Sequence, residues 1–345
     1  MNKKKVFLNV VFLTAIFTVT VYSIFKGEDL REIIDSLHEA NGAIWLIGAA
    51  CVLIFILSES VIIHYLFRSL GTKSRLSHCC LYSFVGFFFS CVTPSASGGQ
   101  PMQVYFMKKD NLSATVSTQI LMVVTVAYKL VLVLWGLVIL IFRPAIIMKH
   151  LNGVMGWCYL GIVLNIAFIV LIAFALFKSS LAEKMALAVI KALGKIKLVK
   201  NTDRLEKRLC SSMKTYRSVA EFYKTHRLVI VNVFLLTLVQ RTVMFFVTYL
   251  VYLSFGLHGD SAVTVVGLQG MISLAADMLP LPGGMGISES LFMKIFEPIF
   301  GEITLPAMVV NRGLSYYTQL LVSAVMTVFA YFIIGRKSKA ERKIK

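Results

Sequence analysis

Charge is scarce in this sequence: Asp, Glu, Lys and Arg together make up 15% of its 345 residues, whereas hydrophobic residues make up 58%. The mean hydropathy is +0.80. A water-soluble domain of this length would carry far more charge, so the composition excludes a soluble enzyme or binding module. We therefore expect an all-α membrane protein that crosses the bilayer several times.

Acidic residues are the scarcer charge type, with 17 Asp and Glu against 35 Lys and Arg, which gives a net charge of +18. Such an excess of positive charge could indicate a nucleic-acid partner. The basic residues, however, lie beside apolar runs, where cytoplasmic flanks and anionic lipid account for them. We therefore expect a membrane phospholipid as the partner, and no nucleic acid.

Motifs for catalysis and metal binding are also missing. The six cysteines show neither a disulfide framework nor a zinc-binding spacing. No activated nucleophile, paired acid and base, or phosphate-binding loop stands out from the rest of the sequence. The sequence therefore predicts no catalytic residues, no metal site and no cofactor.

Six apolar runs are long enough to cross a bilayer, which takes about 20 residues of helix. The first follows a basic N-terminus, is too long for a signal peptide and lacks a cleavage site, so we expect it to be retained. An amphipathic surface helix over 28–40, basic surface helices over 178–227 and a basic tail over 336–345 complete the chain. The predicted spans are residues 6–25, 43–67, 113–142, 157–177, 228–255 and 306–335.

Two motifs rich in proline and glycine interrupt the apolar sequence: Thr93-Pro-Ser-Ala-Ser-Gly-Gly-Gln-Pro101 and Leu279-Pro-Leu-Pro-Gly-Gly-Met-Gly-Ile-Ser-Glu289. Proline removes a backbone donor and glycine permits φ > 0, so helices should end before Pro280 and restart near Ile287. Such irregular backbone survives at membrane depth only where it is buried in protein or lines a polar cavity. Each break therefore predicts part of a binding site, although plain kinks between ordinary spans are the alternative.

Two breaks at corresponding places predict an inverted repeat within one transmembrane domain covering 1–345. The first repeat is 1–150, and the second comprises 151–177 and 228–335. Re-entrant hairpins at both breaks leave six full spans; if the broken segments cross instead, eight or more spans result. With hairpins, most Lys and Arg fall on one side, which predicts a multi-pass plasma-membrane protein with both termini in the cytoplasm.

Four charged residues within the apolar runs are the strongest candidates for a site, because a charge at mid-membrane costs about 2.5–3.5 kcal/mol. Lys129 and Arg312 follow the two breaks by 30 and 28 residues, and Glu59 and Arg241 precede them by 39 and 42. Equivalent positions in two repeats should place all four around one central cavity. We expect that cavity to be net cationic, with Asp277 and Glu289 as counter-charges.

Such a cavity would suit an anionic lipid headgroup, helped by free N–H groups at the start of a broken helix. The alternative is that Lys129 or Arg241 is structural and pairs with Glu59 or Glu289. Glu289 could equally be a charge that complements a helix N-terminus, with Ser288 as the cap. The predicted headgroup-binding residues are Lys129, Arg241, Arg312, Glu59, Glu289, Gly98, Gly99, Gln100, Gly283, Gly284 and Ser288.

Together the two broken motifs resemble the flippase-like transmembrane region of the lysylphosphatidylglycerol synthase (MprF) family, over roughly residues 5–335. The resemblance implies a bacterial or archaeal membrane protein that moves a polar lipid between leaflets. In two-domain members the lipid is lysyl-phosphatidylglycerol, which a C-terminal aminoacyl transferase domain makes and which confers resistance to cationic peptides. Only ten residues follow Gly335, so we expect the transferase domain to be absent and the chain not to be an enzyme by itself.

The function predicted from the sequence is therefore that of a lipid flippase for an anionic or aminoacylated phospholipid, with a separate aminoacyl transferase and a homo-oligomer as further possible partners. One alternative is a phosphatidylglycerol lysyltransferase or a component of a lipid-linked sugar transferase. Another is a scaffold whose basic segment 178–227 only binds anionic lipid or a protein.

Overall fold

The computed structural model describes residues 38–178 and 202–335, together with Asp35 and five residues between 183 and 190. The predicted first span over 6–25, most of the predicted surface helix over 28–40, part of the basic segment 178–227 and the tail over 336–345 lie outside the described residues. The first span therefore remains a prediction.

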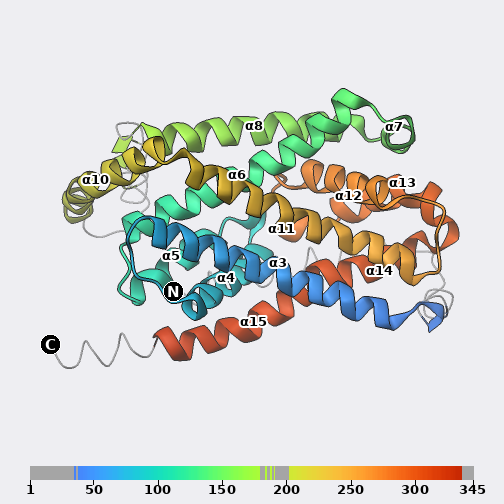
Figure 1. Cartoon of the computed structure of the whole chain (residues 1–345), viewed down its shortest axis with the longest axis horizontal. Helices are drawn as coiled ribbons and strands as arrows, with labels where there is room; N and C mark the ends of the chain where they lie inside the picture. The colour runs from blue at the N-terminus through green and yellow to red at the C-terminus, as the bar shows by residue number, and fades with distance from the viewer. Residues whose placement is uncertain are drawn as a thin grey trace.

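The described part of the chain is all helical, and its longest helices run roughly parallel to one axis of the molecule (Figure 1). Four single helices and the run of helices over Pro282–Ile334 are long and apolar enough to cross a membrane. The four single helices match four of the predicted spans to within a few residues. The run over Pro282–Ile334 contains nearly all of the predicted span over 306–335 and begins earlier in the sequence. The four single helices are α3 (Gly42–Ser69), α6 (Ala114–Phe142), α8 (Met155–Phe177) and α11 (Arg227–Ser254).

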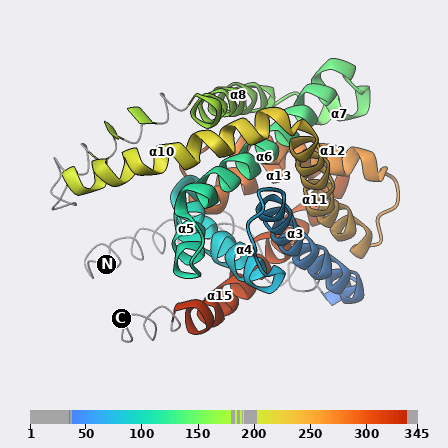
Figure 2. The same ribbon diagram turned by 60° about the vertical axis from the view of Figure 1, so that its left-hand side comes forward.

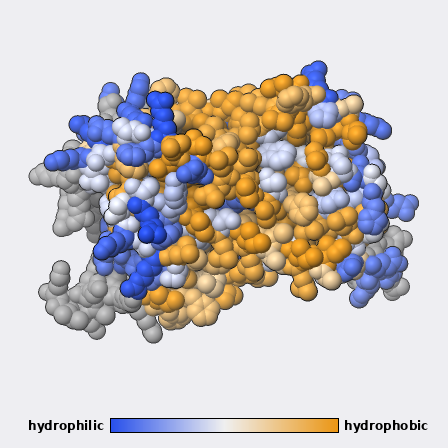
Figure 3. Space-filling view, in the orientation of Figure 1, coloured by the Kyte–Doolittle hydropathy of each residue, from blue (hydrophilic) through white to orange (hydrophobic). Residues whose placement is uncertain are grey.

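Apolar side chains form a wide band across the middle of the face in Figure 3, and polar side chains gather at its two ends. A band of this kind is what a bilayer requires of a protein surface, since hydrocarbon cannot hydrate polar groups. Many large apolar side chains on the long helices are accordingly exposed, for example Ile141 and Phe142 at 72% and 76%. The protein is therefore a multi-pass membrane protein.

The last predicted span is not a continuous α-helix. It consists of α14 (Thr304–Arg312), a π-helical segment over Gly313–Thr318, α15 (Gln319–Ala330) and a second π-helical segment over Tyr331–Gly335. The predicted span over 306–335 is helical throughout and lies almost entirely within the apolar run Pro282–Ile334, with π-helical segments in place of part of the regular α-helix. π-helical turns carry a poorer hydrogen-bond pattern and are frequent at functional sites, and the first one here begins directly after Arg312.

The two motifs rich in proline and glycine separate short helices, as predicted. The first broken segment comprises α4 (Leu76–Cys91), the 3₁₀ turn η1 (Pro94–Ala96) and α5 (Gly99–Lys109). The second comprises α12 (Ala262–Ala276), the 3₁₀ turn η2 (Pro282–Gly284) and α13 (Ile287–Phe300). The predicted helix end before Pro280 and restart near Ile287 are confirmed.

The two turns η1 and η2 lie against each other, and Ser95 Oγ donates a hydrogen bond of 3.3 Å to the carbonyl oxygen of Leu279. Within the first broken segment, α4 packs against α5, and Figure 2 shows the two helices side by side. The second segment likewise packs α12 against α13. Two breaks far apart in the sequence therefore meet inside the bundle.

The long helices α3 and α11, each of 28 residues, pack along each other beside the two breaks. Gln240 Nε2 of α11 donates to the carbonyl oxygen of Phe55 at 2.9 Å, and Trp45 Nε1 of α3 donates to Ser254 Oγ at 3.0 Å. The order of elements recurs: each long helix precedes a short helix, a break and a second short helix. Polar bonds across α3 and α11 thus hold the two halves together.

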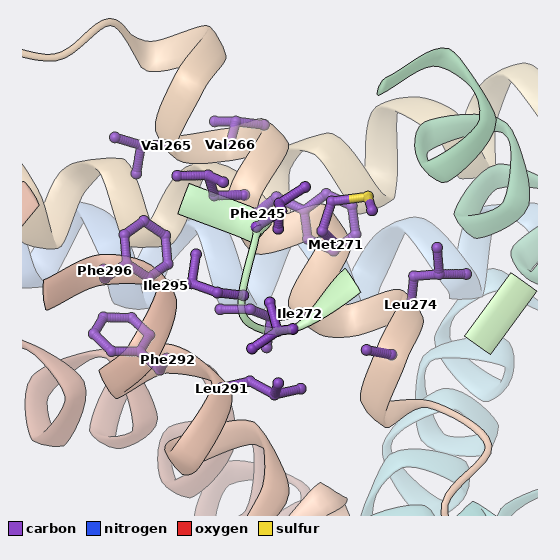
Figure 4. Close-up of a cluster of buried hydrophobic side chains, with 14 of the residues drawn as sticks. Phe245, Val265, Val266, Met271, Ile272, Leu274, Leu291, Phe292, Ile295 and Phe296 are labelled. Atoms are coloured by element: carbon purple, nitrogen blue, oxygen red, sulfur yellow. The ribbon is translucent and has the colours of Figure 1, made fainter. Parts of the chain in front are cut away.

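A core of aliphatic and aromatic side chains surrounds the second broken segment (Figure 4). Ile272 and Leu274 of α12 and Phe292 and Phe296 of α13 are all at most 2% exposed. The short helix α7 (Ala145–Leu151) packs against this core. A second core joins α4 and α5 to α3, α6, α15 and α10 (Thr202–Thr225), the described helix of the basic segment.

Candidate functional site: a cavity between the two breaks

A cavity of about 580 Å³ lies between the two broken segments and the long helices. Glu59 of α3, Lys129 of α6, Arg241 of α11 and Arg312 of α14 all line it. Their spacing from the breaks predicted that they would meet around one cavity, and their placement is confirmed. Four residues from four different helices therefore bring charge to a single space within the bundle.

Lys129 is held by an acid from the second broken segment. Asp277, directly after α12, forms an ion pair with Lys129 Nζ and accepts a hydrogen bond from the Tyr128 hydroxyl. The Lys129 ammonium also lies 3.1 Å from Met278 Sδ. The Lys129 and Asp277 side chains are only 8% and 10% exposed. The acid that pairs with Lys129 is thus Asp277. The alternative that Lys129 pairs with Glu59 or Glu289 was wrong.

Arg312 is held by a second acid from the same broken segment. Its Nε lies 2.8 Å from Glu289 Oε1, and its Nη2 donates to the carbonyl oxygen of Gly283 at 3.0 Å. The other Glu289 oxygen accepts from the backbone N–H of Gly286 at 2.7 Å, at the start of α13. Gly286 takes the N-cap position, so the assignment of Ser288 as the cap was wrong. Glu289 therefore joins a helix start to an arginine.

Among the residues that the structure describes, no acid forms an ion pair with Arg241, unlike Lys129 and Arg312. Its guanidinium carbon lies 3.6 Å from the ring centroid of Tyr128 and 4.8 Å from that of Phe55. Its Nε is buried and has no hydrogen-bond partner within the described chain. Aromatic faces stabilise a guanidinium without using its donors. Arg241 thus keeps its hydrogen-bond donors available.

Glu59 lies near Arg241 without touching it. Glu59 Oε1 accepts a hydrogen bond of 2.8 Å from Gln103 Nε2, and the carboxylate interacts electrostatically with Arg241. In the described part of the chain, the two side chains form no ion pair within 4.0 Å. Glu59 is therefore held by a neutral amide, whereas Asp277 and Glu289 are held by cations.

The formal charges at the cavity balance. Three cations, Lys129, Arg241 and Arg312, are matched by Glu59 and Asp277 in the lining and by Glu289 directly behind it. The expected excess of positive charge is thus a single charge in the lining itself, and Glu289 behind the lining neutralises it. The site is better described as a neutral cavity with one cation whose donors are unused.

The predicted glycines divide into two groups. Gly283 and Gly284 line the cavity with φ of +59° and +66°, and a Cβ on Gly283 would lie 2.1 Å from Tyr316 Cε2. Gly98 and Gly99 do not belong to the lining. A Cβ there would lie 2.6 Å from Thr93 Cγ2 or 2.1 Å from Ser90 Oγ, so close packing within the break requires these two glycines.

The other predicted polar residues, Gln100 and Ser288, line the cavity, and the Gln100 amide donates to Thr125 Oγ1. Several further polar lining residues were not predicted as site residues. Gln103 lies about one helical turn after Gln100, so helical spacing was a usable signal for it. Tyr128 directly precedes Lys129, a spacing that does not place two side chains on one face of a helix. Gln269, Asn311 and Tyr316 gave no comparable signal. The unpredicted polar lining residues include Gln103, Tyr128, Gln269, Asn311, Tyr316 and Gln319, whereas Asp277 was predicted as a counter-charge and does line the cavity.

A polar cavity inside an apolar bundle, bordered by two broken helices, defines a class of multi-pass membrane protein that holds a polar group at membrane depth. The model of the family described as lysylphosphatidylglycerol synthase TM region matches residues 6–323. The chain belongs to this family, and the resemblance carried by the two broken motifs is confirmed. No curated protein matches the chain.

Proposed function

We propose that the protein translocates a polar phospholipid between the two leaflets of the membrane and binds the lipid phosphate at Arg241. Arg241 carries the proposal, because a guanidinium at membrane depth whose buried Nε has no hydrogen-bond partner within the described chain is costly unless an anion binds it. Charge-assisted hydrogen bonds from arginine suit phosphate oxygens well. Membership in the family supports a membrane protein that handles phospholipid.

In the proposed mechanism the headgroup enters the cavity while the acyl chains stay in the surrounding lipid. The Arg241 guanidinium binds the phosphate, and the polar side chains of Gln100, Ser288 and Asn311 offer neutral hydrogen bonds to the rest of the headgroup. Lys129 and Arg312 act mainly through their ion pairs with Asp277 and Glu289, which hold the ends of α12 and α13 beside the cavity. The cavity volume of about 580 Å³ suits a headgroup and excludes whole acyl chains.

We further propose that the two broken segments are re-entrant hairpins. α4 and α12 have 16 and 15 residues, so at about 1.5 Å per residue they span about 24 Å and about 23 Å and fall short of a hydrocarbon core of about 30 Å. The contact between η1 and η2 supports hairpins that enter from opposite sides and meet within the membrane. Rocking of one half against the other would then expose the cavity to each leaflet in turn.

The distribution of basic residues supports the orientation. Arg68 lies in the last turn of α3, Lys73 and Arg75 lie in the connection from α3 to α4, and Lys108 and Lys109 end α5, so both ends of the first broken segment are basic. Loops rich in Lys and Arg stay in the cytoplasm. We therefore place the open ends of α4 and α5 on the cytoplasmic side of the plasma membrane, together with both termini.

The lipid that best suits the site has a phosphate diester. Among such lipids, phosphatidylglycerol and its lysyl derivative suit the family's name, and a separate aminoacyl transferase would then supply the aminoacylated form. Translocation of that form to the outer leaflet would lower the negative surface charge and reduce the binding of cationic peptides.

Reconstitution into phosphatidylcholine vesicles with a trace of NBD-labelled phosphatidylglycerol tests the proposal. Dithionite bleaches probe in the outer leaflet, so translocation appears as loss of the protected fraction. Arg241→Ala should slow translocation about 10- to 100-fold, because a charge-assisted hydrogen bond contributes about 1.5–3 kcal/mol. Arg68→Ala, which removes an exposed arginine at the end of α3, should behave as wild type.

Two results would contradict the proposal. Wild-type protein that bleaches no faster than protein-free vesicles would remove the translocation function. Equal rates for wild type and Arg241→Ala, with both variants folded by size exclusion and thermal unfolding, would remove Arg241 as the phosphate site. Transferase activity in the purified chain would favour the enzyme alternative instead.

A further inference from the structure

Glu59 differs from the other two acids at the cavity in what holds it. Asp277 and Glu289 each form an ion pair with a cation and accept a second hydrogen bond, from the Tyr128 hydroxyl and the Gly286 N–H. Within the described residues, Glu59 accepts only the amide of Gln103 and lies near Arg241 without an ion pair. A proton on Asp277 or Glu289 would break an ion pair, whereas a proton on Glu59 would not.

The titratable groups that line the cavity with Glu59 come from several of the elements that border it. Lys129 and Asp277 neutralise each other, and the Tyr128 hydroxyl donates to that same acid. The Tyr316 hydroxyl donates to the carbonyl oxygen of Cys91 at 3.0 Å. These groups are, by element, Cys91 of α4, Tyr128 and Lys129 of α6, Arg241 of α11, Asp277 after α12, Arg312 of α14 and Tyr316 of the π segment. Within the described cavity, Lys129 and Arg312 are paired with Asp277 and Glu289, so Arg241 is the cation left to interact with Glu59.

Gln103 can satisfy Glu59 in either protonation state. Its Nε2 donates to the carboxylate in this structure. A side-chain amide carries both a donor and an acceptor, so a rotation of the Gln103 amide would present Oε1 to the hydroxyl of a protonated Glu59. A carboxyl group at membrane depth therefore keeps a hydrogen-bond partner with or without its proton.

The balance of charge at the cavity links this acid to the lipid. The formal charges of the three cations and three carboxylates sum to zero, so a phosphate diester at Arg241 adds one uncompensated negative charge. An unpaired charge in a low-dielectric environment is costly. One proton on Glu59 restores neutrality and removes the competition between carboxylate and phosphate for the Arg241 guanidinium.

We infer that Glu59 takes up one proton for each anionic phosphate headgroup that binds at Arg241, so that lipid and proton cross the membrane together. The inference rests on the proposed lipid translocation. The balance is one lipid monoanion and one proton moved in the same direction, with no net charge transferred. By linkage, the phosphate binds more tightly when Glu59 is neutral, and the proton binds more tightly when the phosphate is present.

Coupling of this kind has a defined signature. A difference of one pH unit across the membrane shifts the leaflet distribution of the anionic lipid about tenfold towards the alkaline side at equilibrium. The membrane potential has no effect, because the transported pair is neutral. An uncoupled scramblase would leave the lipid equally distributed at any pH difference, and translocation of the lipid anion alone would respond to the potential.

The test uses the full chain in phosphatidylcholine vesicles with NBD-labelled phosphatidylglycerol, a pH step of one unit and a potential clamped with potassium and valinomycin. Wild type should accumulate probe about tenfold in the leaflet on the alkaline side. Glu59→Gln, which keeps a neutral amide beside Gln103, should give a leaflet ratio near one at the same pH step. Glu59→Asp should restore the dependence on pH.

The outcomes separate the inference from the proposed function. Proton coupling is overturned if wild type moves the probe but its leaflet ratio does not respond to the pH step. It is also overturned if the leaflet ratio of Glu59→Gln still responds. Lipid translocation stands in both cases. No movement above protein-free vesicles overturns lipid translocation, and coupling with it. The readout is a ratio of leaflets at equilibrium, so a lower rate in the folded variant does not alter it.

A binding measurement checks the proton count without transport. Calorimetry of dihexanoyl phosphatidylglycerol binding to the purified protein, in two buffers of different ionisation heat, gives the protons exchanged per lipid. Wild type should take up about one proton at a pH where free Glu59 is ionised, and Glu59→Gln about none, as the linkage above requires. Binding to wild type without proton uptake between pH 5 and 9 overturns the inference.

Discussion

The two breaks begin with the same type of turn, built from different residues. In both, a proline opens a 3₁₀ turn and two residues with left-handed φ follow. In the second break these are Gly283 and Gly284 at +59° and +66°, whereas in the first they are Ser95 and Ala96 at +49° and +54°. A left-handed conformation costs a residue with Cβ about 1–2 kcal/mol and costs glycine almost nothing. The first break is therefore strained where the second is relaxed.

The second break is also held by more contacts with its surroundings than the first. Both acids that form ion pairs at the cavity, Asp277 and Glu289, flank the second break, and Pro282 and Met285 within it are buried. The first break has no acid beside it, and residues 94–97 are exposed. Strain persists only where surrounding structure enforces it. Fewer contacts are present to enforce the strain of the first break, so it is the break that we expect to move during the proposed transport.

The outer ends of the broken segments are also unlike. His78 Nδ1 lies 2.5 Å from Asp110 Oδ2 at the open ends of α4 and α5, and Tyr82 donates to the same oxygen. At the second segment, Tyr252 and Phe300 pack edge to face with ring centroids 5.7 Å apart. The hydrogen bonds of His78 and Tyr82 to Asp110 can be replaced by hydrogen bonds to water, whereas separating Tyr252 from Phe300 exposes apolar surface. This difference again makes the first segment the more adaptable one.

The largest effect should come from removing an ion pair of the second break. Glu289→Ala leaves the Arg312 guanidinium in the cavity without its acid and removes the acceptor for the Gly286 N–H. We expect a loss of about 3–5 kcal/mol in the free energy of unfolding, measured in detergent. Glu289→Ala combined with Arg312→Met should recover part of that loss, and a double variant that is simply the sum of two single losses would contradict the coupling.

A smaller but substantial effect should follow from adding a Cβ to the second break. Gly283→Ala places a methyl group about where Tyr316 Cε2 lies and forces an L-residue to a φ of +59°. We expect a loss of about 2–3 kcal/mol from overpacking and backbone strain together. Ser95→Ala at the corresponding place in the first break should cost no more than about 1 kcal/mol, because only the hydrogen bond to Leu279 is removed. Equal losses would show that the breaks are not packed differently.

The sequence predicted those features that depend on residue type and helical spacing. Proline and glycine marked both breaks, and a charge in an apolar run identified Lys129 and Arg241 as cavity residues. Helical spacing does not reveal which acid contacts which cation, because Asp277 reaches Lys129 only through the packing of α12 against α6. The left-handed φ of Ser95 was equally hidden, since a serine gives no sign that the chain turns as a glycine would.

The smallest predicted effect tests the strain in the first break directly. Ala96→Gly should relieve about 1 kcal/mol of left-handed strain, offset in part by the greater freedom that glycine gives the unfolded chain. We expect a net gain of about 0.5 kcal/mol, seen as a small rise in the melting temperature in detergent. Ala49→Gly inside α3 should instead lose up to about 1 kcal/mol, since glycine weakens a regular helix. A loss for Ala96→Gly as large as that for Ala49→Gly would mean that the first break bears no strain and that its difference from the second lies in packing alone.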